Sequence, residues 1–257
     1  MTPDDRIAAE RVQRADPMRF AAIMAAPAPV RPVLFAVAAY NVEIARAPWA
    51  SAEPMVAEMR LQWWIDALER GQIPHEIGPA LEAAIADGVP VALLVEAAEA
   101  RRWDCWSEPF SDQTAFESYI DATSGGVLMA AAQGLGVGTE AAPAMRSAGW
   151  AAGLAQFLCA IPELEARGRV PLLDGRPEAV SALARQGLAR LADAEDARKA
   201  LEVDIRERLA PVWLQTHAAP GILKRAAAKP VRVAQSALMP SEFARRAGLL
   251  FAALRRP

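Results

Sequence analysis

The chain has 257 residues, of which 53% are hydrophobic and 23% are charged, and its formal net charge is −3. This balance is typical of a folded globular protein and excludes a disordered chain, and it disfavours a nucleic-acid-binding protein, which needs a concentrated basic surface. Two cysteines are too few for a disulfide framework, so a cytoplasmic protein is expected.

Neither a signal peptide nor a membrane span is predicted. The N-terminal segment "MTPDDRIAAERVQRADP" is polar and charged, unlike the apolar centre of a signal peptide. The longest uncharged stretch, 122–139, contains five glycines and several polar residues, which favour close packing against protein rather than contact with lipid. Peripheral attachment to a membrane remains open.

In chain order, apolar periodicity and capping signals predict helices throughout. Thr2 and Pro3 begin the first helix, Glu53 and Pro54 begin another that ends at Gly71, and Ser111 or Asp112 and Pro177 mark later starts. The predicted helices cover residues 3–24, 30–47, 54–70, 78–100, 112–137, 141–166, 177–193, 196–218, 220–228 and 240–255. Because alternating apolar and polar runs are absent, the fold class is all-α.

One domain is expected over 1–257, since neither a repeat nor a Gly/Ser-rich linker divides the chain. Residues 226–240 form the best candidate for an irregular connection, which leaves 241–257 as a C-terminal helical appendage. The arginines and apolar residues of "FARRAGLLFAALRRP" suit either packing on the bundle, the more common case, or contact with an anionic membrane surface.

Two motifs have a structural and a functional interpretation. In "EMRLQWWIDALERG" (58–71) one helical face is apolar, which favours core packing, and Arg60 is placed to stack on an indole or to pair with Glu43. In "ATSGGVLMAAAQGLG" (122–136) the small residues permit close helix packing, the more probable role, or a local break that opens a cavity.

A third motif, "AIPELEARGRVPLL" (160–173), contains Pro162 and two glutamates. Pro162 is expected to kink or interrupt its helix. Glu163 and Glu165 are either metal ligands or, more simply, part of a solvated helix end that stops at Gly168. The two histidines, His75 and His217, show no metal-binding spacing, so zinc and a Ser-His-Asp triad are not expected.

The chain resembles the squalene/phytoene synthase family between Phe20 and Arg225. The landmarks that carry this resemblance are "LFAVAAYNVEIA", "MRLQWWIDAL", "LLVEAAEARRWD", "YIDATSGGVLMAAAQGLG" and "ARGRVPLL", in the family's order. The resemblance implies a single isoprenoid-synthase-like helical bundle around a central apolar cavity. Active members join two prenyl diphosphates head to head, with Mg²⁺ held by two aspartate-rich DxxxD motifs on facing helices.

Both aspartate motifs are missing. The aligned positions of the first are about Ala45 and Trp49, and those of the second are about Ala160 and Leu164. Only Glu163 matches an acidic position of the second motif, while Glu43 and Glu165 lie off the aligned aspartates. Isolated acids are not expected to assemble a diphosphate site with several metal ions, so no cofactor is predicted.

The pair "NVEIA" and "RLQWW" resembles a divergent branch of the family, the mitochondrial complex I assembly factors and their bacterial relatives. This resemblance implies a noncatalytic role at the inner face of the cytoplasmic membrane, with complex I subunits or assembly intermediates as partners and with a lipid or prenyl ligand in the cavity. The alternatives are an active Mg²⁺-dependent head-to-head prenyl transferase using Glu43, Glu163 and Glu165, and a scaffold without any ligand.

If a pocket is retained, nine residues at positions matched to the family's motifs are expected to line or brace it. They are Tyr40, Asn41, Glu43, Arg60, Trp63, Trp64, Tyr119, Ser124 and Glu163. Because an unpaired inward carboxylate is costly, Glu43 is predicted to pair with Arg60.

Overall fold

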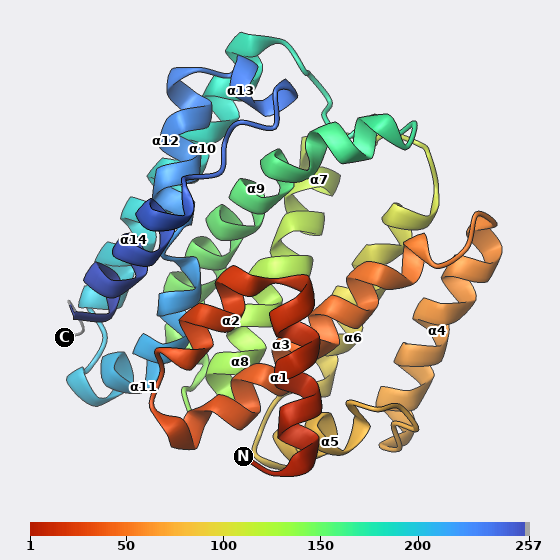
Figure 1. Ribbon diagram of the computed structural model, residues 1–257, viewed down its shortest axis with the longest axis vertical. Helices are drawn as coiled ribbons and strands as arrows, with labels where there is room; N and C mark the ends of the chain where they lie inside the picture. Colours follow the sequence, from red (N-terminus) through yellow and green to blue (C-terminus); the bar gives the residue numbers. More distant parts are fainter. Residues whose placement is uncertain (255–257) are drawn as a thin grey trace.

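The computed structural model describes residues 1–254, and this part of the chain is built from helices without any strand (Figure 1). The α-helices are α1 (Pro3–Ala15), α2 (Pro17–Met24), α3 (Arg31–Arg46), α4 (Pro54–Arg70), α5 (Gly78–Ala86), α6 (Val91–Ala100), α7 (Gln113–Ile120), α8 (Val127–Gln133), α9 (Ala142–Ala166), α10 (Pro177–Lys199), α11 (Val203–Trp213), α12 (Ala219–Ala228), α13 (Val231–Ala234) and α14 (Glu242–Leu254). A π-helical segment, Asp121–Gly126, joins α7 to α8. The predicted all-α class is confirmed.

The predicted capping residues lie at the helix ends. The Thr2 hydroxyl accepts from the Asp5 N–H at 3.2 Å, and the Asp5 carboxylate accepts from the Thr2 N–H at 2.6 Å. Asp112 caps α7 by accepting from the Ala115 N–H at 2.8 Å. Gly71 ends α4 with a φ of 68°, a left-handed conformation that glycine adopts without strain.

Two helices predicted as continuous are broken. The segment 3–24 divides at Asp16, whose carboxylate accepts from the Arg19 N–H at 3.0 Å and so starts α2. The segment 78–100 divides between Gly88, which has a φ of 112°, and Pro90, which precedes α6. In both places one helix ends and the next begins within a few residues, so the apolar periodicity alone does not show the break.

Two other helices continue beyond a predicted end or a predicted interruption. Helix α10 continues to Lys199, beyond its predicted end at 193, and i,i+3 ion pairs such as Arg198–Glu195 support its last turns. The predicted interruption at Pro162 is wrong, because α9 runs through it to Ala166. Buried side chains on both sides of Pro162, Ile161 and Leu164, outweigh the one backbone hydrogen bond that proline removes.

The segments predicted as 112–137 and 226–240 also differ in detail. The first is helical only to Gln133 and contains the π-helical segment, and the second includes the end of α12 and the short helix α13. Helix α8 ends before the predicted residue 137 because the chain turns at Gly136, which has a φ of 73°.

The buried apolar side chains form two clusters. The first lies among α1 to α6, α8 and α11 and includes Phe35, Tyr40 and Leu61. The second lies mainly among α7, α9, α10 and α12 and includes Trp150 and Leu158. Figure 1 shows α9 running between the α10, α12 and α14 side of the molecule and the side formed by α1 to α6. The candidate site described below lies between α3 and α9, where the two clusters meet.

The small residues of 122–136 provide close packing against α9. The Ser124 hydroxyl donates to the Gly149 carbonyl at 2.8 Å, and a Cβ on Gly149 would lie 2.7 Å from the Gly125 Cα. The π-helical segment also turns Thr123 and Ser124 toward a cavity. The motif therefore serves both roles considered from the sequence, close packing and a local irregularity beside a cavity.

None of the helices in residues 1–254 is both long enough and apolar enough to cross a bilayer.

Candidate functional site

A cavity of about 260 Å³ lies between α3 and α9, and we call it the inner cavity. It is lined by Asn41, Ala45, Trp49, Arg101, Asp104, Tyr119, Ile120, Thr123, Ser124, Gly153, Gln156, Phe157, Ala160, Glu163, Leu164 and Arg167. Asn41 and Ala45 are one turn apart on α3, as are Phe157 and Ala160 on α9, so each helix presents one face to the cavity. The lining is mixed, since nine of these sixteen residues carry polar side chains, and three of the polar residues form one hydrogen-bonded group.

The polar group is formed by Arg101, Asp104 and Tyr119. Arg101 Nη1 donates to the Tyr119 hydroxyl at 2.7 Å and to Asp104 Oδ2 at 3.1 Å, and the Tyr119 hydroxyl lies 2.9 Å from the same Oδ2. Burial raises the pKa of Tyr119 above its ordinary value. Burial alone would lower the pKa of Arg101, but Tyr119 and Asp104 raise it more, so Arg101 stays charged.

Two buried polar atoms beside this cavity have no hydrogen-bond partner among the described residues. They are Oδ1 of Asn41, a side chain that is only 8% exposed, and Nε of Arg101. A buried polar atom without a partner costs free energy, and a ligand that supplies the missing hydrogen bond recovers it. The inner cavity is therefore suited to a ligand that combines apolar surface with at least one polar or charged group.

The mouth of the inner cavity is formed by Trp49, Glu163 and Arg167, which also line a second, larger space. The Arg167 guanidinium lies over the Trp49 ring, with 4.4 Å between Cζ and the ring centroid, and its Nη2 lies 2.6 Å from Glu163 Oε1. Arg169 approaches the same indole, at 5.3 Å. These cation–π contacts place positive charge where the two spaces meet.

The second space, which we call the outer cleft, has a volume of about 1200 Å³. It is lined by Arg11, Ala15, Glu43, Arg46, Ala47, Trp49, Ala50, Val56, Met59, Arg60, Trp63, Trp64, Pro74, His75, Glu163 and Arg167. No ion pair within the described residues involves Arg46 or Arg60. The outer cleft thus combines free positive charge with aromatic and apolar walls.

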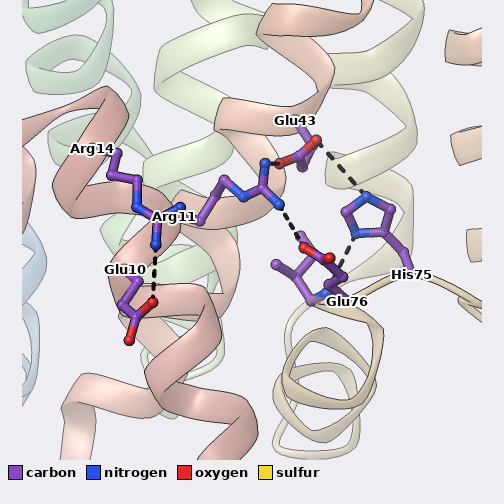
Figure 2. A network of polar contacts seen from close by, with 7 residues as sticks. Glu10, Arg11, Arg14, Glu43, His75 and Glu76 are labelled. Atoms are coloured by element: carbon purple, nitrogen blue, oxygen red, sulfur yellow. Dashed lines mark hydrogen bonds and ion pairs between the residues drawn. The ribbon is translucent and has the colours of Figure 1, made fainter.

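Glu43 pairs with Arg11 at one edge of the outer cleft, as Figure 2 shows. Arg11 Nη1 lies 3.1 Å from Glu43 Oε1, and Arg11 Nη2 lies 2.8 Å from Glu76 Oε2. His75 Nε2 lies 3.9 Å from Glu43 Oε2. The predicted pair between Glu43 and Arg60 is wrong. Because α1 packs on α3, Arg11 reaches Glu43, and Arg60 remains elsewhere in the cleft wall.

Eight of the nine residues predicted for the pocket line one or both of the two spaces. Asn41, Tyr119 and Ser124 line the inner cavity, Glu163 lies at the mouth, and Glu43, Arg60, Trp63 and Trp64 line the outer cleft. Tyr40 lines neither, since it is fully buried, donates to the Leu94 carbonyl at 2.8 Å and packs edge-on against Trp64. Binding of a ligand by any of these residues stays a prediction.

Sequence reasoning missed several residues of this site. Arg101 and Asp104 stand three apart in "ARRWD", a spacing typical of an ion pair, and that signal could have identified them. Arg167 was not singled out within its motif, and Arg11 carried no local signal because its partner lies on another helix.

The residues at the mouth do not fit a magnesium–diphosphate cluster. The four positions predicted to align with the family's aspartates, Ala45, Trp49, Ala160 and Leu164, line the inner cavity from facing elements, and none carries a carboxylate. Within residues 1–254, no three His, Cys, Asp or Glu side chains are arranged to hold a metal ion. Mg²⁺ requires oxygen ligands, whereas the mouth offers the single carboxylate of Glu163 beside the Arg167 guanidinium.

Comparisons with known proteins agree with this fold. The profile of the squalene/phytoene synthase family matches residues 12–245. The structure is similar to a ligand-bound crystal structure of a dehydrosqualene synthase, with a TM-score of 0.71 and 14% identity, over 97% of this chain and 95% of that one. It is also similar to the squalene synthase HpnC from Alicyclobacillus acidocaldarius, with a TM-score of 0.70 and 15% identity, over 88% of this chain and 95% of that one. No significant match was found among curated protein sequences.

Proposed function

The chain belongs to the squalene/phytoene synthase family, and we propose that it is a member without catalytic activity that assists the assembly of respiratory complex I. The proposed loss of activity rests on which residues line the mouth of the inner cavity. Ala45, Trp49, Ala160 and Leu164 face this cavity where the reaction needs carboxylates, and Arg167 stacks on Trp49. Ionising an allylic diphosphate requires metal ions bridging it to such ligands.

The two spaces together limit the ligand. The inner cavity of about 260 Å³ lies just below the range of about 300–1,000 Å³ that is typical of pockets for one drug-sized ligand, and it adjoins the outer cleft of about 1200 Å³ at the mouth. We propose that a lipid or prenyl compound binds with its polar group beside Asn41 and Arg101.

The role in complex I assembly rests on the resemblance of "NVEIA" and "RLQWW" to the assembly-factor branch. Four of the residues in these two motifs line the outer cleft from α3 and α4: Glu43, Arg60, Trp63 and Trp64. Met59 beside them is 67% exposed, so an apolar and basic surface is accessible there. We propose that a complex I subunit or assembly intermediate binds at the outer cleft.

The first test is calorimetry with the full chain and a farnesyl thiodiphosphate, with Mg²⁺ and with a chelator. The proposal expects no heat that depends on Mg²⁺. In the source organism, deletion of the gene is expected to lower the amount of assembled complex I, measured on native gels. Tight binding that requires Mg²⁺ would contradict the noncatalytic assignment, and normal complex I without the protein would contradict the assembly role.

An active head-to-head prenyl transferase is the second candidate. The observations that favour it are the fold shared with two synthases over most of the chain and the presence of Glu163 at the mouth. Glu163, however, is the one carboxylate among the three residues of the mouth, and a single carboxylate is too few to hold several Mg²⁺ ions on a diphosphate. Product formation from a prenyl diphosphate in the presence of Mg²⁺ would establish this activity.

A further inference from the structure

Helix α14 turns its apolar side chains outward. Phe243 is 82% exposed, Leu250 59%, Phe251 63% and Leu254 72%. These positions are separated by seven, eight and eleven residues from Phe243, so they lie on one face of the helix. Scattered exposed apolar residues are normal, but four large ones on one helical face mark an interaction surface.

The opposite face of α14 holds the helix only loosely against the bundle. Glu242, Arg245, Arg246 and Leu249 line a cavity of about 160 Å³ shared with α2, and Ala252 lines another of about 490 Å³ beside α10 and α12. No residue of α14 is buried. Figure 1 shows α14 at the outer edge of the molecule, next to α12. The outward face of α14 is therefore free to contact a partner.

Charge distinguishes the possible partners of this face. Residues 241–257 contain four arginines and one glutamate, a charge of +3, whereas the whole chain carries −3 and residues 1–240 therefore carry −6. Two of the arginines, Arg245 and Arg246, lie in the described part of α14. An anionic surface attracts this segment, and a second copy of the same segment repels it.

We propose that α14 is an interfacial helix, which lies flat on an anionic phospholipid bilayer with Phe243, Leu250, Phe251 and Leu254 inserted at the headgroup boundary. A short helix with a large apolar face and flanking arginines binds membranes in this way, because apolar burial and attraction to anionic lipid act together. Phenylalanine and leucine provide the buried area, and the net positive charge of residues 241–257 attracts the segment to anionic lipid, although Arg246 must leave its ion pair with Glu242 to contact a phosphate.

The experiment is flotation of the full chain with vesicles of phosphatidylcholine alone or mixed with phosphatidylglycerol. The test variant is L250E/F251E, and the matched control is V203E/V231E, which places the same charge change at two valines that are each 56% exposed on other helices. A second variant, R245Q/R246Q, tests the electrostatic attraction between the helix and the anionic lipid. All four side chains of the acidic variants are exposed, so thermal unfolding is expected to be unchanged and serves to verify folding.

The proposal expects the unaltered chain and V203E/V231E to float with phosphatidylglycerol-containing vesicles. L250E/F251E should lose at least about tenfold in partitioning, and R245Q/R246Q about fivefold for each arginine that contacts lipid. Absence of flotation of the unaltered chain would overturn the proposal, as would equal flotation of L250E/F251E. A dimer seen by light scattering that L250E/F251E abolishes, without any vesicle binding, would assign the face to a second copy instead.

Discussion

Arg11 on α1 and Glu43 on α3 form an ion pair of 3.1 Å across the edge of the outer cleft, and both side chains are mostly buried, with 24% and 13% exposed. Glu43, an acid within the apolar helix α3, thus has a partner other than the predicted Arg60. It is held by a basic residue more than thirty positions earlier in the chain, and Arg11 also binds Glu76 before α5. This pair ties the N-terminal helix to the wall of the candidate site.

Removing Arg11 should destabilise the fold. In Arg11→Met the Glu43 carboxylate keeps only the distant His75, so the free energy of unfolding is expected to fall by about 1–3 kcal/mol. The control is Arg14→Met on the same helix. Both side chains of its pair with Glu10 are exposed, so the free energy of unfolding is expected to fall by less than about 0.5 kcal/mol. Urea denaturation measures both, and equal losses would show that the Arg11–Glu43 pair adds nothing.

Much of the fold could be predicted because its signals are local. Thr2, Asp112 and Gly71 act at helix ends through bonds to residues at most a few positions away, and apolar periodicity shows the faces between them. The breaks at Asp16 and Gly88 were missed although local signals mark them, since Asp16 precedes Pro17 and Gly88 stands two residues before Pro90.

The site could be predicted only in part, because its contacts join distant segments. Asn41, Glu43 and Arg60 were identified from matched motifs, and each lines one of the two spaces. The partner of Glu43 and the stacking of Arg167 on Trp49 depend on how α1, α3 and α9 pack, and no local pattern encodes that arrangement.

The contact between Gly149 and the π-helical segment should not tolerate a side chain. A Cβ on Gly149 would lie 2.7 Å from Gly125 Cα, a backbone atom that cannot rotate away. Gly149→Ala is therefore expected to lower stability by about 2–3 kcal/mol, although alanine favours helices. Gly221→Ala on α12, where the nearest atom is the end of Arg225 at 4.0 Å, should instead stabilise by about 0.5 kcal/mol. Thermal unfolding compares the two, and a neutral Gly149→Ala would show that α9 shifts to accommodate it.

The chain's two tyrosines, Tyr40 and Tyr119, should not ionise in the folded protein at moderately alkaline pH. Burial raises the pKa of both above the ordinary 10.0, so the folded state holds these protons at a pH where the unfolded state releases them. The stability from the neutral phenols is then fully present below pH 10 and is lost as the pH rises above it.

Tyrosinate absorbance measures this directly, because only these two residues contribute. The folded chain should show little tyrosinate up to about pH 11, and the chain in urea should titrate near pH 10. Tyr119→Phe and Tyr40→Phe each remove one of the two groups and so assign any residual signal. Half of the full signal appearing near pH 10 in the folded chain would place one phenol in contact with water.

Restoring the carboxylates should restore metal binding. The variant A45D/W49D/A160D/L164D places four aspartates, in two pairs with i,i+4 spacing, around the mouth of the inner cavity. Mg²⁺ with a farnesyl thiodiphosphate is expected to raise the midpoint of thermal unfolding of this variant and to leave the unaltered chain unchanged, since a ligand stabilises only the state that binds it. The control A45N/W49N/A160N/L164N has the same shape without the charge, so a gain seen in it as well would show that metal binding does not depend on these carboxylates. A gain confined to the aspartate variant would mean that the fold still positions the four sites and that their side chains alone separate this chain from a diphosphate-binding enzyme.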